Sequence, residues 1–355
     1  MSQTGRIILC VLCGLLILSA PFLFSSPVML SEVKMELMEE AEDEDSVELD
    51  FSRLLFPSAR AEEEVPAADE DLIVETADDD GSSLGPAVWN LPLDFSVPPA
   101  PKAENFTEDR YEDETIRVRM EHREEDGVIW HLAFVQIASP TQLRTATASE
   151  KLTSSRTASV SGMARINNAV VAINGDNYID KPEKTTFEYR MTQKIRSKTN
   201  KTKDMLIIDE NGDFHLVLAS PKAEQTAALK AVADEHTIVN AYTFGPALVI
   251  DGEEQQINKE YGYNPNGKEP RAALGQTGPL SYVLAIAEGR GVSSGVTHQA
   301  LAHFMADLGC IQAFNLDGGN SAEMVFNDQI YKGMPGGDER GLSDILYFAT
   351  AVPEE

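Results

Sequence analysis

The sequence predicts an α+β protein in which mixed, largely antiparallel sheets are packed with a few helices. Many short apolar segments are separated by turn signals, and several neighbouring segments have the spacing of hairpins. Only two segments show a clear helical pattern. A doubly wound nucleotide-binding fold is disfavoured, because no GxGxxG motif follows a strand-like segment and no GxxxxGKS phosphate loop occurs.

An apolar segment precedes the predicted folded part of the 355-residue chain. Residues 7–24 follow Arg6, and their length is typical of a signal anchor or of the core of a signal peptide. The arginine predicts a short cytoplasmic N-terminus and export of the remainder. We expect a cell-membrane protein with one N-terminal anchor and an extracytoplasmic C-terminal domain, or a secreted one if residues 1–30 are cleaved. Pro21 and Pro27 favour the anchor, since a cleavage site needs small residues there.

Residues 31–114 are predicted to form a disordered acidic spacer. Runs of Asp and Glu, several prolines and few aromatic residues cannot bury enough apolar surface to offset the ordering entropy. The net charge of −29 argues against nucleic-acid binding through a basic surface. Cys310 is the only cysteine after the apolar segment, which excludes a disulfide or a thiolate metal cluster within the exported part.

The folded domain is predicted to cover residues 115–355. Apolar and polar residues alternate in some of its strand-like segments, while other segments are continuously apolar and read as buried strands. In chain order these segments are residues 116–123, 130–138, 167–175, 204–218 and 245–257. The turn sequences Glu-Glu-Asp-Gly, Glu-Asn-Gly-Asp and Asp-Gly predict hairpins between or within them.

Two helices are predicted between these strands. Residues 293–310 have apolar side chains at helical spacing, with Ser294 and Thr297 as N-cap candidates and Gly309 just after the end. Residues 220–235 form the second, with Ala and Leu along one face. Their apolar faces are expected to pack on the sheets.

Polar residues gather at the ends of the strand-like segments, where ligands are commonly held. The candidates are Asn174, Gly175, Asp176, Arg271, Asp317, Gly318, Gly319, Asn320, Ser321, Glu339 and Arg340. In the stretch FNLDGGNSAEMVF, the glycines would let the backbone approach a ligand closely. A plain turn is the alternative, because Asp, Gly and Asn are also typical turn residues.

Several motifs give the chain a family resemblance. AINGDNY, FGPALVIDG, PRAALGQTGPLSYVLAIAEGRG, SSGVTHQALAHFMADLG, NLDGGNSAEMVF and ERGLSDILYF occur in this order between residues 170 and 351. They resemble the phosphodiester glycosidases, whose animal member removes N-acetylglucosamine from a sugar phosphodiester. The resemblance implies a hydrolase that acts on a phosphate-containing glycan of the envelope or extracellular space. No obligate protein partner is inferred.

The resemblance also implies roles. Asp317 would act as base for water or stabilise an oxocarbenium-like centre, and Arg271 with Arg340 would bind the phosphate. Asn174 and Ser321 would hold sugar hydroxyls, the two glycines would offer N–H groups to the anion, and Glu339 matches the family's late Glu-Arg pair. A phosphate monoester is a good leaving group, so an acid is less needed than in other glycosidases.

Alternatives stay open for these residues. Arg271 could pair structurally with Glu269 or Glu339, and Asp176 and Asp317 could share a calcium or magnesium ion, which prefer oxygen ligands. The basic residues 194–203 form either a solvated loop or a guide for an anionic glycan. His298 and His303 lie on the polar side of a predicted helix and are expected to be solvated. As a whole, the protein could instead bind glycans without turnover or act as a metal-dependent phosphodiesterase.

Overall fold

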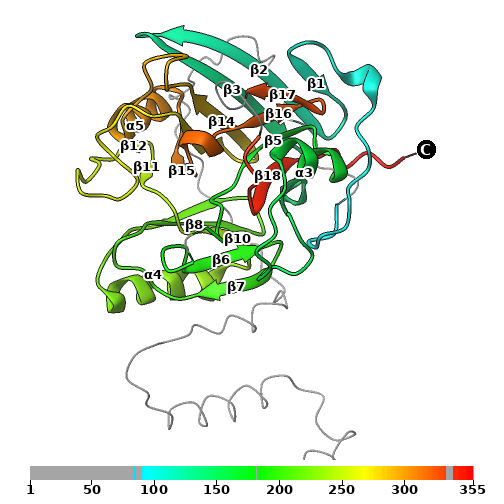
Figure 1. Cartoon of the computed structure of the whole chain (residues 1–355). Coiled ribbons are helices and arrows are strands. Elements are labelled where there is room, and N and C mark those ends of the chain that lie inside the picture. Colours follow the sequence, from blue (N-terminus) through cyan, green and yellow to red (C-terminus); the bar gives the residue numbers. More distant parts are fainter. Residues whose placement is uncertain (1–83, 85–89, 181, 333–338, 355) are drawn as a thin grey trace, which may run out of the picture. The chain divides into compact units, whose positions relative to one another are not determined.

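The computed structural model describes residues 84, 90–180, 182–332 and 339–354 (Figure 1). The apolar segment at residues 7–24 and most of the predicted acidic spacer lie outside the described residues. Within the part that the structure describes, no helix is long and apolar enough to cross a membrane. The membrane anchor therefore stays a prediction.

The described strands form three sheets (Figure 1). The eight-stranded sheet has the order β1 (Arg110–Glu112), β2 (Ile116–Glu125), β3 (Val128–Ile137), β14 (Ser281–Ala287), β13 (Arg271–Gly278), β15 (Gln312–Asn315), β11 (Ala247–Ile250) and β12 (Glu253–Glu254). One five-stranded sheet has the order β17 (Gln329–Lys332), β16 (Met324–Phe326), β5 (Val171–Asn174), β18 (Asp344–Phe348) and β4 (Leu143–Thr147). The other has the order β7 (Gln193–Ser197), β6 (Phe187–Arg190), β10 (Ile238–Tyr242), β8 (Met205–Asp209) and β9 (Phe214–Val217).

All pairings between these described strands are antiparallel, which confirms the largely antiparallel α+β prediction. The predicted hairpins are present as β2–β3, β8–β9 and β11–β12. The expected parallel component of a mixed sheet does not occur among the described strands. Hairpins produce antiparallel neighbours, and the pairings between strands that are distant in the sequence, such as β14–β3 and β18–β5, are antiparallel as well.

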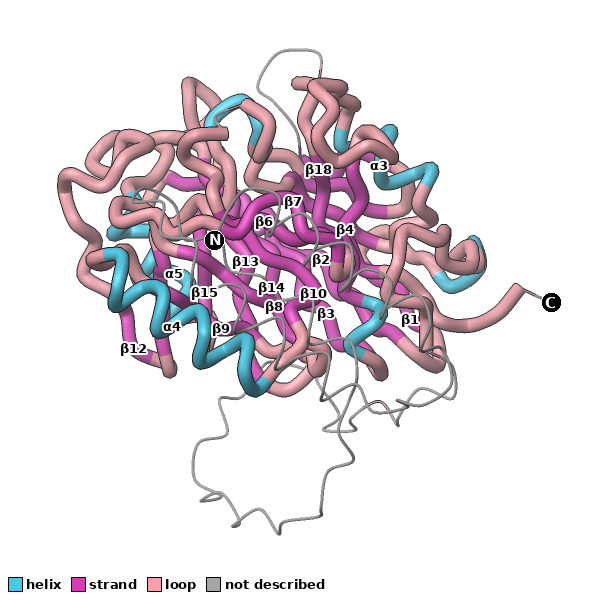
Figure 2. The backbone as a smooth tube through the Cα atoms, turned by 90° about the horizontal axis from the view of Figure 1, so that it is seen from below, coloured by secondary structure: helices cyan, strands magenta, loops and turns pink. Residues whose placement is uncertain are grey.

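Three α-helices are described, and each packs on one sheet (Figures 1 and 2). They are α3 (Val160–Ile166), α4 (Lys222–Glu235) and α5 (His298–Asp307), with short 3-10 helices η2 (Ala103–Asn105), η3 (Pro140–Gln142) and η4 (Gly319–Ser321). The predictions of α4 and α5 are confirmed. Thr297 is the N-cap of α5 and accepts a hydrogen bond from Ala300 N, whereas Ser294 is not the cap. Gly309 follows the helix with a φ of 77°.

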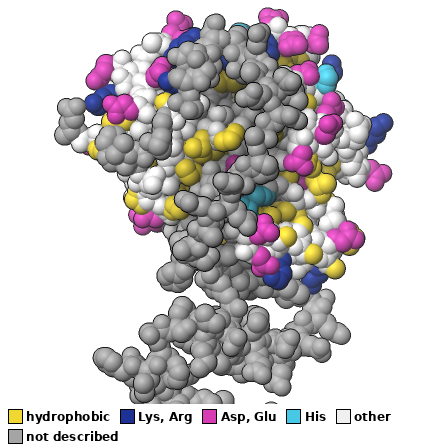
Figure 3. All heavy atoms as spheres, turned by 180° about the vertical axis from the view of Figure 1, so that it is seen from behind, with side chains coloured by type: hydrophobic (Ala, Val, Ile, Leu, Met, Phe, Trp, Pro, Cys, Tyr) yellow, Lys and Arg dark blue, Asp and Glu magenta, His cyan; other side chains and the backbone are white. Residues whose placement is uncertain are grey.

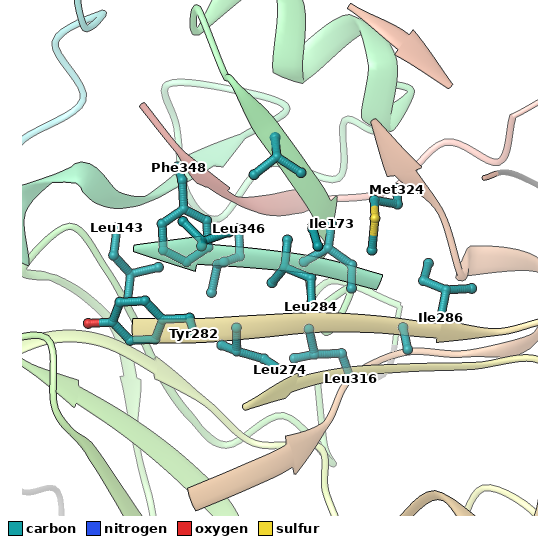
Figure 4. Close-up of a cluster of buried hydrophobic side chains, with 14 of the residues drawn as sticks. Leu143, Ile173, Leu274, Tyr282, Leu284, Ile286, Leu316, Met324, Leu346 and Phe348 are labelled. Atoms are coloured by element: carbon teal, nitrogen blue, oxygen red, sulfur yellow. The ribbon is translucent and has the colours of Figure 1, made fainter. Parts of the chain in front are cut away.

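The main core lies between the eight-stranded sheet and the sheet that contains β5. Figure 4 shows Leu274, Tyr282 and Leu284 of the first sheet packed against side chains of the second. Successive residues of a strand point to opposite faces, so β14 supplies two cores. Tyr282, Leu284 and Ile286 enter this core, while Val283, Ala285 and Ala287 pack toward α5 on the other face.

The described part of the chain includes residues 90–114, which lie within the segment predicted to be a spacer. β1 pairs with β2, and Tyr111 is buried in the main core. Arg144 is buried and donates hydrogen bonds to the carbonyl oxygens of Pro92 (2.8 Å), Asp94 (2.7 Å) and Ser96 (2.9 Å). Residues 90–114 are thus held by backbone contacts that their acidic composition does not reveal.

Two further expectations need correction. His298 is fully buried at the start of α5 instead of solvated, and burial lowers its pKa to about 2. The basic residues 194–203 are not simply a solvated loop, because the first of them belong to strand β7. Lys203 is buried, and its Nζ lies 3.7 Å from the ring centroid of Tyr263. On the face shown in Figure 3, acidic and basic side chains are interspersed.

Candidate active site

Asn174 holds the end of β5 to the turn that follows β15. Its Nδ2 donates to the carbonyl oxygens of Asp317 (2.7 Å) and Gly175 (2.9 Å), and its Oδ1 accepts from the N–H of Glu323 (3.1 Å). The side chain is fully buried. Its recorded hydrogen bonds all go to the main chain, so Asn174 positions the turn that carries Asp317.

The carboxylate of Asp317 has a cation and a hydroxyl beside it. Arg340 Nη1 lies 3.8 Å from Asp317 Oδ2 and donates to Ser321 Oγ (2.8 Å). Arg340 Nη2 also lies 3.6 Å from Asp180 Oδ2. Burial raises the pKa of Asp317 to about 6, although the Ser321 hydroxyl and the Arg340 charge both act to lower it. The group therefore titrates close to neutrality, in the range suited to acid–base chemistry.

Asp317 lines a small pocket with a cavity volume of about 20 Å³. The residues around it are Asp176, Asn177, Asp180, Thr185, Phe244, Tyr263 and Asp317. The rings of Phe244 and Tyr263 are stacked, with centroids 4.1 Å apart and planes 4° from parallel. The pocket thus combines carboxylates with an aromatic wall, and Lys203 supports the ring of Tyr263.

A cluster of buried charged side chains fixes the position of Asp176. Arg190, at the end of β6, lies 2.7 Å from Asp176, 2.9 Å from Asp344 and 3.1 Å from Glu188. All four side chains are fully buried. Burial and the neighbouring carboxylates raise the pKa of Asp176 well above its usual range, because one guanidinium faces three acids. Asp176 Oδ1 accepts from Arg190, and the acid also shares a hydrogen bond with Glu188, which contributes to its raised pKa.

Gly175 is required by this cluster. A Cβ at this position would lie 2.1 Å from Asp344 Oδ2, so no larger residue fits without moving the buried carboxylate. Its N–H donates to the Asp344 carbonyl (3.1 Å), and its own carbonyl accepts from Asp317 N (3.4 Å). The Asn-Gly pair thus joins three elements: β5, β18 and the turn after β15.

Glu323 and Glu339 form a pair of carboxyl groups near the same turn. Glu323 is buried, and burial together with the hydrogen-bonded Glu339 raises its pKa to about 9. Burial opposes ionisation of Glu339 too, but hydrogen bonds from Glu323 and Ser161 outweigh it and lower its pKa. Glu339 accepts from Ser161 N (2.9 Å) and Ser161 Oγ (2.6 Å) at the start of α3. At neutral pH the shared proton therefore resides on Glu323.

Arg271 is directed into the fold. Its guanidinium donates to the carbonyl oxygens of Asn264 (2.7 Å), Tyr263 (3.0 Å), Gly267 (3.1 Å) and Val296 (3.3 Å). Burial lowers its pKa to about 10. The contacts predicted as alternatives, to Glu269 or Glu339, are not among its hydrogen bonds. In this structure Arg271 secures the loop that presents Tyr263 to the pocket.

The Gly-Gly turn packs closely on the residue before Arg271. A Cβ on Gly318 would lie 2.7 Å from the Pro270 carbonyl oxygen, and Gly319 N donates to that same oxygen (2.8 Å). Gly319 has a φ of 61°, which favours glycine. Asn320 is exposed and accepts a hydrogen bond from Arg290. The N–H of Gly319 is therefore engaged by protein in this structure.

The structure brings Asp176 and Asp317 to one pocket and places Ser321 and Arg340 beside Asp317. Arg271 and Asn174 bind main-chain carbonyls, and Glu339 binds the start of α3. Sequence reasoning did not assign Asp180, Tyr263 or Phe244. Phe244 begins the quoted FGPALVIDG motif but was given no role, and the quoted motifs do not include Asp180 or Tyr263. Glu323 lies within the quoted FNLDGGNSAEMVF stretch but was assigned no role. The pocket aspartates offer oxygen ligands of the kind that calcium or magnesium prefers, so a shared cation stays a prediction.

The model of the phosphodiester glycosidase family matches residues 167–349, slightly more than half of the chain. Every pocket-lining and turn residue described above lies within this range. The chain belongs to the phosphodiester glycosidase family, as its motifs predict.

Two relatives are informative. The catalytic domain of zebrafish N-acetylglucosamine-1-phosphodiester alpha-N-acetylglucosaminidase, auto-inhibited by its pro-peptide, superposes with a TM-score of 0.50 and 15% identity. The match covers 76% of this chain and 96% of that one, and shows a shared fold. The SPbeta prophage-derived uncharacterized protein YomE of Bacillus subtilis is 32% identical over 108 residues. These make up 30% of this chain and 17% of that protein, so only a small part of YomE is matched.

Proposed function

We propose that the protein hydrolyses sugar-1-phosphodiesters at the bond between the anomeric carbon and the phosphate oxygen. The observation that carries this proposal is the contact of Asp317 with Arg340 at the pocket edge, 3.8 Å between Oδ2 and Nη1. It sets a carboxylate beside a cation that can bind phosphate. Membership of the family supports the same reaction class.

In the proposed reaction, Asp317 acts on the anomeric carbon. It either takes a proton from the attacking water or stabilises the oxocarbenium-like transition state. The water oxygen bonds to the anomeric carbon, and the electrons of the broken carbon–oxygen bond leave with the phosphate monoester. The phosphate departs as an anion, so the reaction needs no separate strong acid.

The phosphate is assigned to Arg340 because its guanidinium is half-exposed beside Asp317. Its side chain is 40% accessible, whereas Arg271 is buried and donates to four carbonyl oxygens. Arg271 is therefore proposed to act as a positioning residue for the Tyr263 loop. Asn174 has the same kind of role for the turn of Asp317.

The sugar is assigned to the aromatic wall and the buried aspartate. Phe244 and Tyr263 line the pocket and are proposed to contact the C–H groups of a pyranose through their ring edges, because one face of the Tyr263 ring is stacked on Phe244 and Lys203 lies 3.7 Å from its centroid. Asp176 lines the pocket and is the proposed partner of a sugar hydroxyl, while the buried Ser321 hydroxyl is bonded to Arg340 beside Asp317. The substrate is proposed to be a phosphate-containing glycan of the envelope or extracellular space, because the apolar segment at residues 7–24 is typical of an exported protein.

The test uses the full chain in detergent with UDP-N-acetylglucosamine and a panel of synthetic sugar-1-phosphodiesters. We expect release of a free reducing sugar by the wild type and its loss in Asp317→Asn. The Asn variant keeps the size of the side chain, so unfolding measurements should match those of the wild type. Binding without turnover would instead identify a glycan-binding protein. Chelator-sensitive release of a sugar 1-phosphate would identify a metal-dependent phosphodiesterase.

A further inference from the structure

Two imidazoles and one carboxylate meet at the sheet that packs on α4, among residues that the proposed reaction does not use. Asp209 ends β8, His215 lies on β9, and His236 follows α4 as its C-cap. His215 Nε2 and His236 Nδ1 each lie 3.0 Å from Asp209 Oδ2. The three donor atoms all lie within 4.8 Å of one another.

The two carboxylate oxygens of Asp209 make different contacts. Oδ1 accepts from the N–H groups of Asn211 (2.8 Å) and Asp213 (2.9 Å), which fixes the turn between β8 and β9. Oδ2 faces the two imidazoles. The carboxylate is buried and held rigidly by the turn, as a preorganised ligand should be.

Hydrogen bonding accounts for only one of the imidazoles. His215 Nε2 is hydrogen-bonded to Asp209 Oδ2 (3.0 Å). His236 Nδ1 is equally close to the same oxygen, yet it is buried and has no hydrogen-bond partner among the described residues. Buried ring nitrogens are normally paired, so this atom needs another explanation. A metal ion supplies one, since a neutral imidazole nitrogen binds a metal through its lone pair.

The donor set and its spacing fit a transition-metal ion. Two imidazole nitrogens and a carboxylate oxygen are typical zinc ligands, and in a tetrahedral site with bonds of about 2.1 Å neighbouring ligand atoms lie about 3.4 Å apart. Asp209 Oδ2 lies 3.0 Å from each of the two ring nitrogens, so these ligand atoms would need to move apart only slightly to hold the ion. Glu210 Oε1, 3.8 Å from His236 Nδ1, or a water molecule could complete the shell.

The surroundings also favour a cation. The imidazole side chains are 25% and 27% exposed, so an ion can reach them from solvent. His236 caps the C-terminus of the 14-residue helix α4, where the helix dipole attracts positive charge. We propose that Asp209, His215 and His236 bind a divalent transition-metal ion, and that zinc is the ion that suits them best.

The bound ion would join the end of α4 to the β8–β9 turn. The other side of this turn is already fixed to the eight-stranded sheet, because Gln276 Nε2 donates to Asp213 Oδ1 (2.8 Å) and Tyr282 donates to the Gly212 carbonyl (2.9 Å). The site is thus structural: it stabilises the folded state by binding it in preference to the unfolded chain.

The experiment is a calorimetric titration of zinc chloride into untagged, chelator-treated full chain in detergent. We expect one ion per chain, a rise in melting temperature with zinc, and affinity weakened by about tenfold or more in His215→Ala and His236→Ala. His303→Ala is the matched control, since His303 contacts Glu254 (2.9 Å) and Asp307 (3.4 Å) at the surface but lacks a second imidazole. It should bind zinc like the wild type.

Absence of zinc binding by the wild type would overturn the proposal, and so would equal affinities in all four proteins. If an alanine variant fails to fold, cobalt titration of the wild type supplies the test without any variant. Bound cobalt in a site with two imidazoles should produce visible absorption that zinc abolishes. Failure to see such absorption would count against the site in the same way.

Discussion

The side-chain amide of Asn174 donates a 2.7 Å hydrogen bond to the carbonyl oxygen of Asp317. This bond joins β5 of one sheet to the turn that leaves β15 of another. The carboxylate of Asp317 is therefore placed by the junction between two sheets. Residues 143 positions apart in the sequence form this junction.

We expect Asn174→Ala to lower both stability and turnover. It leaves buried main-chain groups of Asp317 and Glu323 unpaired, which costs about 1–3 kcal/mol per group. Urea unfolding and kcat on a sugar phosphodiester measure the two effects. Asn167→Ala is the control, because it also loses an amide-to-carbonyl bond (2.8 Å to Met163) but lies at the end of α3. If both variants kept wild-type kcat, Asn174 would have no positioning role.

Gly175→Ala should unfold or strongly destabilise the protein. The new Cβ would lie 2.1 Å from Asp344 Oδ2 and displace a carboxylate from the Arg190 cluster. Disrupting a buried ion pair costs about 3 kcal/mol or more. The control is Gly278→Ala in β13, where an added Cβ meets no atom within 4 Å. Equal thermal stabilities of the two variants would contradict the assigned packing.

The pH dependence of kcat/KM should follow the ionisation of the Asp317 carboxyl group. A base must be deprotonated, so activity should rise with pH through the Asp317 pKa of about 6. Arg340 lowers that pKa, and Arg340→Gln should therefore move the rise to higher pH. The same variant should reduce kcat/KM by about 10- to 100-fold, as expected when a charged hydrogen-bond donor is lost. A profile unchanged by Arg340→Gln would argue against their interaction.

Glu323 should make the protein less stable as pH rises. Its pKa is raised from 4.5 to about 9, so between these values the folded state holds a proton that the unfolded state has released. Stability from this group is complete below pH 4.5 and is lost as pH rises toward 9. Glu323→Gln mimics the protonated acid and should flatten the curve of unfolding free energy against pH. The exposed control Glu253→Gln should leave the curve's slope as in the wild type.

Local patterns predicted much of the fold. Thr297 and Gly309 mark the ends of α5 correctly, because caps depend on neighbouring residues alone. Helix α3 was not predicted, since its seven residues include Gly162 and are too few for a periodic signal. His298 was assigned to the polar side of a helix, but its burial depends on the loops packed around it.

The sequence predicted the motif residues of the candidate site, but it predicted few of the contacts that their side chains make. Asp176 and Asp317 follow strands in the sequence, and both reach the pocket. Nothing local reveals that the Arg271 guanidinium turns toward four carbonyl oxygens, or that Tyr263 completes the pocket wall. Such contacts depend on where separate sheets meet, which a single sequence does not display.

The most direct test of the proposed function is hydrolysis in oxygen-18 water. The full chain is incubated with a sugar-1-phosphodiester that it turns over, and both products are examined by mass spectrometry beside an Asp317→Asn reaction. Cleavage between the anomeric carbon and oxygen predicts label on the free sugar, none on the phosphate, and no labelled product from the variant. Label on the phosphate would contradict the account, because water would then have attacked phosphorus.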